Sequence, residues 1–346
     1  MLFAPRPLTG RRARQFYRVS SLSKLRLIIL VLGPLPIVAG SIALSTWARS
    51  GSAEFSLIGN LALQAQETGS RPATSVRNRD VRTSSDPNLQ PACLALGKDL
   101  AGRLGEDCQW IARAPFVIAG DLTKAELERW HRQTIGPAAR SLAASYFDVA
   151  PTEPITVLLF SREESYNHYA HQLYGDEGIS VYGYYKPDRR TLVMNISTGG
   201  GTLVHELTHA LMDFDFPAVP DWFNEGLASL YEQCRFRRDE SGIDGLVNWR
   251  LPALKEAIAQ GRLRSLKSLI GDDDFRGANE GVNYAQARYF CMFMQERRVL
   301  EKYFGRFRGN QAADPLGLKT VAEVFPDQSW DELDKEFQDW VSGLEL

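Results

Sequence analysis

The stretch HELTHALMDF, residues 205–214, places His205 and His209 four residues apart, with Glu206 beside the first histidine. Residues four apart on an α-helix project from the same face, so both imidazoles can reach one ion. Imidazole is a common ligand of Zn²⁺, and a glutamate in this position can take a proton from a metal-bound water as general base. With only five histidines in the chain, this HExxH pattern favours a catalytic zinc site over a chance pair.

A catalytic zinc site needs a third protein ligand, with one position left open for water. Glu225 is the candidate, because it follows His209 by sixteen residues in PDWFNEGLASLYE, which has helical spacing of apolar residues. Two helices joined by FDFPAVPD would bring its carboxylate opposite the histidine pair. Taken alone, Glu225 would be interpreted as a solvated helix residue. Beside the histidine pair, it is predicted to be the third metal ligand.

Two segments resemble parts of known zinc peptidases. HELTHALMD resembles the zinc helix of thermolysin-like peptidases, and WFNEGLA is similar to the W-x-N-E-G-x-A segment of aminopeptidase N-type enzymes. Together they resemble the gluzincins, and among these the bacterial peptidase MA-like group, closely over residues 190–232 and loosely over 114–340. The resemblance implies a zincin-like fold, with His205, His209 and Glu225 as zinc ligands and Glu206 as general base.

The chain departs from this pattern in two respects. The gap between His209 and Glu225 is shorter by a few residues than in thermolysin or aminopeptidase N. LVMNIS occupies the region where aminopeptidases carry a G-A-M-E-N-like stretch, which holds the free amino end of the substrate. The resemblance therefore implies an endopeptidase rather than an aminopeptidase.

Further residues around this site can be nominated. In gluzincins a tyrosine or histidine of the helical half often stabilises the oxyanion, which makes Tyr284 the second catalytic candidate; a tyrosine that only packs on the core is the alternative. Asp213 or Asp215 could accept the second N–H of a zinc histidine, or either could lie on the surface. Asn224 is assigned to the hydrogen bonding of the glutamate helix itself.

The elements that must position these residues fall into two halves. Apolar runs at 114–120 and 155–160 predict buried strands, and 179–197 predicts two strands joined by a turn at KPDR. The segment 191–197 is either an exposed edge strand, to which a peptide could add, or an inner core strand. Helical spacing dominates from PDWFNEG onwards. The order predicts an α+β fold: a mixed sheet with helices including the HExxH helix, then a mainly helical half, with a cleft between.

The N-terminal region predicts a membrane anchor. Residues 1–53 contain eight Lys and Arg but no Asp or Glu, and 27–47 is an uncharged apolar run of 21 residues, where about 20 suffice to span a bilayer. We expect a basic cytoplasmic arm at 1–26, a single-pass signal anchor at 27–47, a flexible stalk at 48–90 and an exported metallopeptidase-like domain at 91–346, on the periplasmic or extracellular side. A cleaved signal peptide or an organellar presequence is the alternative.

The composition of the chain limits the kinds of partner that we expect it to bind. A formal net charge of −2 argues against a general nucleic-acid binder. In an exported domain Cys93 and Cys108 could form a disulfide; two unpaired thiols are the alternative. His168 and His171 lie three apart with no supporting carboxylate pattern and are expected on the surface.

Two classes of function follow from the sequence. One is a membrane-anchored zinc endopeptidase acting on peptide or protein substrates. The other is a catalytically inactive anchored binding module of the same fold, and a zinc amidase is a variant of the first. The oligomeric state stays open.

Overall fold

The computed structural model describes residues 86–346. The expected cytoplasmic arm, the membrane anchor at 27–47 and almost all of the expected stalk lie outside the described residues. Within 86–346, none of the helices combines the length and the apolar character that crossing a membrane requires. The first helix within the described residues, α2 (Leu89–Leu104), begins two residues before the expected domain boundary.

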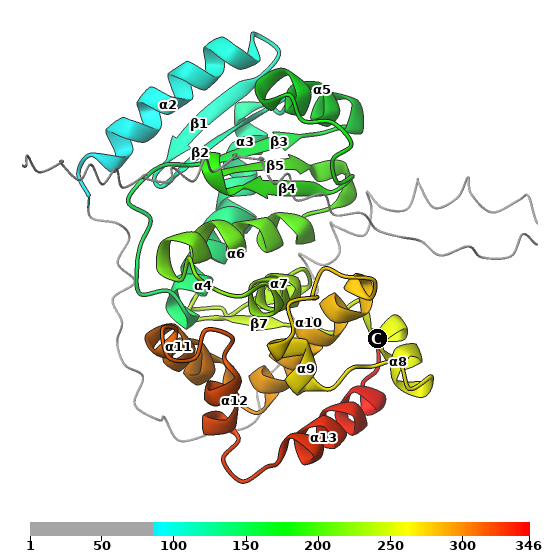
Figure 1. Cartoon of the computed structure of the whole chain (residues 1–346). Coiled ribbons are helices and arrows are strands. Elements are labelled where there is room, and N and C mark those ends of the chain that lie inside the picture. The colour runs from blue at the N-terminus through cyan, green and yellow to red at the C-terminus, as the bar shows by residue number, and fades with distance from the viewer. Residues whose placement is uncertain (1–85) are drawn as a thin grey trace, which may run out of the picture.

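The N-terminal half is built on a five-stranded mixed sheet (Figure 1). Its strands lie in the order β1-β2-β3-β5-β4, with β2, β3 and β5 parallel and both outer strands antiparallel to their neighbours. The three parallel strands are buried along their whole length, as expected where both faces of a sheet are covered. The strands are β1 (Gln109–Arg113), β2 (Phe116–Gly120), β3 (Ile155–Phe160), β4 (Gly183–Lys186) and β5 (Thr191–Asn195).

The predicted pair of strands within 179–197 is confirmed as β4 and β5, joined by the short 3-10 turn Pro187–Arg189. β5 lies between β3 and β4, so the TLVMN segment is an inner core strand and not the edge. The edge strand on this side of the sheet is β4. Any peptide that extends the sheet here would pair with β4.

Helices cover both faces of the sheet (Figure 1). On one face, α2 and α5 (Glu163–Tyr174) enclose a core that includes Leu100, Val117 and Phe160. On the other face, α3 (Lys124–Trp130), a π-helical turn (His131–Ile135), α4 (Gly136–Ser145) and α6 (Gly201–Asp215) form a second core. This second core continues into the helical half, so the sheet and the later helices are packed as one structure.

Cys93 and Cys108 are free thiols within the core of the first face. Burial raises the pKa of both thiols, which keeps them protonated and unreactive at neutral pH. Because both thiols are free in the structure, the possible disulfide is not formed and the alternative of two unpaired thiols holds.

The second half is mainly helical, as expected, with one small hairpin. Helix α10 is its centre: twelve consecutive residues, 283–294, are buried, and it packs along α7. The described chain is thus a mixed α+β structure. The elements of this half are α7 (Asp221–Leu230), β6 (Cys234–Phe236), β7 (Ile243–Gly245), α8 (Leu251–Ala259), α9 (Leu266–Gly271), α10 (Glu280–Glu296), α11 (Leu300–Asn310), α12 (Leu318–Val324) and α13 (Trp330–Gly343).

A glycine allows α6 to approach the chain that follows α7. A Cβ atom on Gly201, the first residue of α6, would lie 2.4 Å from the backbone oxygen of Glu232. No real Cβ tolerates such a distance to backbone, so only glycine permits this packing. The close approach fixes the start of the histidine helix against the segment that follows the glutamate helix.

We expect Gly201→Ala to lower the free energy of unfolding by about 1–3 kcal/mol, because the methyl group overpacks this contact. Gly102→Ala is the matched control: Gly102 lies in α2 with nothing within 4 Å of its added Cβ, so helix propensity should stabilise the protein by up to about 1 kcal/mol. Denaturant unfolding of both variants measures the difference. Equal stabilities would contradict the close approach.

Candidate metal centre

Helices α6 and α7 bring the three predicted metal ligands together. The Nε2 atoms of His205 and His209 lie 3.1 Å apart, and Oε2 of Glu225 lies 3.4 Å from each of them. All three side chains are buried. The four-residue spacing on α6 aligns the imidazoles, and the short connection 216–220 places α7 opposite them.

The spacing of these three atoms fits a metal ion. A tetrahedral ion such as Zn²⁺, with bonds of about 2.0–2.2 Å, separates its ligand atoms by about 3.3–3.6 Å. The observed triangle has sides of 3.1, 3.4 and 3.4 Å. At 3.4 Å the carboxylate is too far from either imidazole for a good hydrogen bond. Oε2 of Glu225 is accordingly buried without a hydrogen-bond donor in the described part of the chain, a deficit that a cation would remove.

The electrostatics of the group favour positive charge at its centre. Burial opposes a charge on His205, yet the carboxylates of Glu225 and Glu232 outweigh it and raise the pKa of His205 to about 10. Burial also opposes ionisation of Glu225, but the two imidazoles hold its pKa well below the usual range. The three buried side chains can therefore hold a metal ion, which would replace a proton on the imidazole.

The outer nitrogen of His209 has a close acceptor. Nδ1 of His209 lies 2.8 Å from Oδ1 of Asn224. If Nδ1 carries the hydrogen and donates it to Asn224, the lone pair of Nε2 faces the centre. The assignment of Asn224 to the internal bonding of its own helix was wrong, because its amide orients a histidine of the other helix.

Glu232 has the corresponding place behind His205, and the sequence reasoning missed it. Its Oε1 lies 3.4 Å from Nδ1 of His205, so a movement of a few tenths of an ångström would complete the hydrogen bond. Arg250 donates to both Glu232 oxygens, at 3.0 and 2.8 Å, and Asn248 donates to Oε2 at 3.1 Å. Helical spacing from Glu225 could not have identified it, because Glu232 lies in the turn that follows the end of α7.

The two aspartates nominated for this role lie elsewhere. Asp215 is buried, accepts hydrogen bonds from the backbone N–H groups of Asp148 and Val149, and pairs with Arg308. It anchors the chain after α4 and neither contacts a site histidine nor lies on the surface. Asp213 lies beside Tyr185 of β4; burial and then this carboxylate raise the pKa of the tyrosine.

Glu206 and Tyr284 differ in their surroundings. Glu206 is buried beside the two site imidazoles. Burial raises its pKa, although the neighbouring imidazoles oppose the shift. Tyr284 is buried at the start of α10, and its oxygen accepts a hydrogen bond from Arg276 at 2.8 Å. Arg276 also donates to Glu225, so Tyr284 is linked to the ligand group through this arginine.

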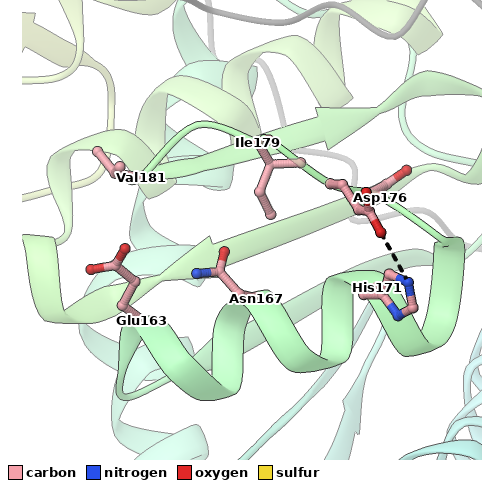
Figure 2. A pocket seen from close by; sticks show the side chains of 8 residues that line it. Glu163, Asn167, His171, Asp176, Ile179 and Val181 are labelled. Carbon is pink, nitrogen blue, oxygen red and sulfur yellow. Dashed lines mark ion pairs between the residues drawn. The ribbon is translucent and has the colours of Figure 1, made fainter.

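A surface pocket of about 340 Å³ lies at a different place (Figure 2). Glu163, Asn167 and His171 of α5 face Ile179 and Val181 of the following loop across it. None of its lining residues belongs to the histidine–glutamate group. His168 and His171 are exposed, as expected, and Nε2 of His171 lies 3.3 Å from Glu177. The cleft between the two halves stays a prediction.

Comparison with known proteins adds no assignment. Neither a scan against protein-family models nor a search of curated proteins found a match for this chain. Interpretation of the site therefore depends on the chemistry of its own residues.

We expect the purified full chain to bind one divalent transition-metal ion per molecule and to release it to a strong chelator. His209→Ala removes a ligand. It should lower metal affinity by more than the 10–100-fold that is typical when a residue hydrogen-bonded to a ligand is replaced. His171→Ala, a substitution of an exposed histidine, is the control and should leave binding unchanged. Metal analysis after dialysis and competition with a chromophoric chelator measure both, and equal binding by the two variants would contradict the ligand set.

For Glu232→Gln we expect metal affinity to fall by about 10–100-fold, because His205 loses a charged acceptor on its outer nitrogen. Glu177→Gln provides the matched control, since Glu177 lies beside an exposed histidine at nearly the same distance. Competition titration would separate the two variants. An unchanged affinity in Glu232→Gln would remove Glu232 from the site.

Proposed function

We propose that this protein is a membrane-anchored, zinc-dependent endopeptidase with a zincin-like fold. The observation that carries the proposal is the convergence of His205, His209 and Glu225 on one point, with Glu206 adjacent in sequence to a ligand. Two nitrogen donors and one oxygen donor suit Zn²⁺, and three protein ligands are the number found in catalytic zinc sites. Anchoring through 27–47 and export of the domain belong to the same proposal.

The residues of the chain divide the chemistry among them. Zinc, when bound, lowers the pKa of water and polarises a peptide carbonyl. Glu206 accepts a proton from the attacking water and passes it to the leaving amine nitrogen. Its burial and raised pKa suit this role, because a carboxylate of higher proton affinity is a stronger base. The Tyr284 hydroxyl supplies a hydrogen bond to the developing oxyanion.

The sheet offers a place for an extended substrate. β4 is the edge strand, and α6 packs against both β4 and β5. A peptide that pairs with the free edge of β4 would run beside the histidine helix. Main-chain pairing of this kind recognises an extended backbone rather than a free terminus, which agrees with endopeptidase activity.

The non-catalytic module is the less favoured alternative. A binding module needs no general base beside the ligand group, whereas this chain keeps Glu206 adjacent in sequence to His205. A zinc amidase would use the same water chemistry and would differ only in the bond that is cleaved.

We expect Glu206→Gln to retain the metal and to lose hydrolysis by about 10²–10⁴-fold, the usual contribution of a general base. Digestion of a broad peptide library, followed by mass spectrometry, would compare wild type, Glu206→Gln and Glu163→Gln, an exposed control. Cleavage by the wild type should stop when a chelator is added. Full hydrolysis by Glu206→Gln, or cleavage that persists without metal, would refute the assignment.

A further inference from the structure

Arg276 contacts Glu225 on the side away from the histidines. It lies between α9 and α10, and its three guanidinium nitrogens have three different acceptors. Nη2 donates to Oε1 of Glu225, Nε donates to Asp221 at 2.9 Å, and Nη1 donates to the oxygen of Tyr284 at 2.8 Å. The side chain is 26% exposed, whereas that of Glu225 is 5% exposed. A buried ligand carboxylate is thus held from behind by a partly buried cation.

The two oxygens of Glu225 have different surroundings. Oε1 accepts from Arg276, while Oε2 faces both imidazoles at 3.4 Å and has no donor within 86–346. A carboxylate can bind a metal through one oxygen or through both. A charge-assisted hydrogen bond to Oε1 competes with the second mode, because it engages a lone pair of Oε1 and holds the carboxylate in one orientation.

The planar guanidinium suits this task. Asp221 and Glu225 are four residues apart on α7, so their carboxylates lie on the same helical face. One planar guanidinium can donate to both carboxylates and also to Tyr284, with its N–H groups in fixed directions. A lysine ammonium on a flexible side chain does not fix the directions of its donors in this way. Since arginine only donates, the hydroxyl hydrogen of Tyr284 is left for another acceptor.

We propose that Arg276 is a positioning residue that restricts Glu225 to ligation through Oε2 alone. Two histidines and one carboxylate oxygen would then fill three positions of a four-coordinate ion and would leave the fourth for water. Without Arg276, Oε1 turns toward the ion and takes up coordination space. The inference rests on the metal site of the proposed function, and it does not depend on the identity of the substrate.

Cobalt substitution of the full chain tests this directly. Four-coordinate Co²⁺ absorbs visible light several-fold more strongly than Co²⁺ of higher coordination number. We expect strong absorption from the wild type and a several-fold loss in Arg276→Leu, with one Co²⁺ still bound per chain. Tyr284→Phe removes another contact of Arg276 but keeps the Glu225 contact, so it should retain the wild-type spectrum. A merely structural role of Arg276 predicts loss of the ion rather than a weaker spectrum.

The outcomes separate the inference from the proposed function. A wild-type spectrum in metal-loaded Arg276→Leu, or release of the ion from this variant while it remains folded, overturns the role of Arg276 alone. A wild-type chain that binds no Co²⁺ overturns both. Should Arg276→Leu fail to fold, Arg276→Lys provides the test. Lysine keeps the positive charge but lacks the planar guanidinium with its several donors. We therefore expect a smaller loss of absorption, in the same direction. An unchanged spectrum in the lysine variant overturns the inference.

Discussion

The Glu225 carboxylate is the group on which the arrangement of the site depends. One of its oxygens faces two imidazole nitrogens, is buried, and has no hydrogen-bond donor within residues 86–346. Burying an ionised oxygen in this way destabilises a protein unless positive charge lies close by. The two histidines and Arg276 surround Glu225, and the point where the three ligand atoms converge is where a cation removes the remaining deficit. Much of the nearby packing can be understood as support for this one carboxylate.

The charges of the side chains around the ligand group alternate in sign with distance from it. The ligand group carries the carboxylate of Glu225, and the next layer places Glu232 behind one histidine and Arg276 behind the glutamate. Burial opposes ionisation of Glu232, but its interactions with His205 and with the paired Arg250 lower its pKa to about 2. Each group is thus fixed by a partner of opposite sign. Such layering orients ligands with hydrogen bonds rather than with bulk packing, and it keeps the centre receptive to a cation.

The parts of the site that sequence could predict are those that depend on local periodicity. The histidine pair and its glutamate need only one turn of α6, and Glu225 could be placed from the helical spacing around it. Asn224, Glu232 and Arg276 were missed or misassigned because their roles arise between elements: Arg276 meets Glu225 across fifty-one residues of chain. Asp215 shows the same limit, since its partners come from α11 and from the segment after α4.

The fold shows a similar division. Strands and helices were recognisable from apolar runs, and the α+β order with a helical second half is confirmed. Strand order was not recognisable, because whether TLVMN is central or at the edge depends on which strands pair across the sheet. Nor did the composition reveal that Cys93 and Cys108 remain free thiols. Strand register and side-chain pairing depend on packing between distant parts of the chain, and the type of an individual residue does not predict that packing.

Glu206 gives the strongest physical reason to expect chemistry at this site. Natural proteins seldom bury a carboxylate without a specific use for it, because its desolvation lowers stability. Here the Glu206 carboxylate is adjacent in sequence to a candidate ligand and interacts with both site imidazoles, while the neighbouring Glu225 and Glu232 are each held by an arginine. The contrast is informative, since two carboxylates have arginine partners and the charges acting on the third are those of the site imidazoles. Under the proposed function, a carboxylate without an arginine partner can accept and release a proton, as general-base catalysis requires.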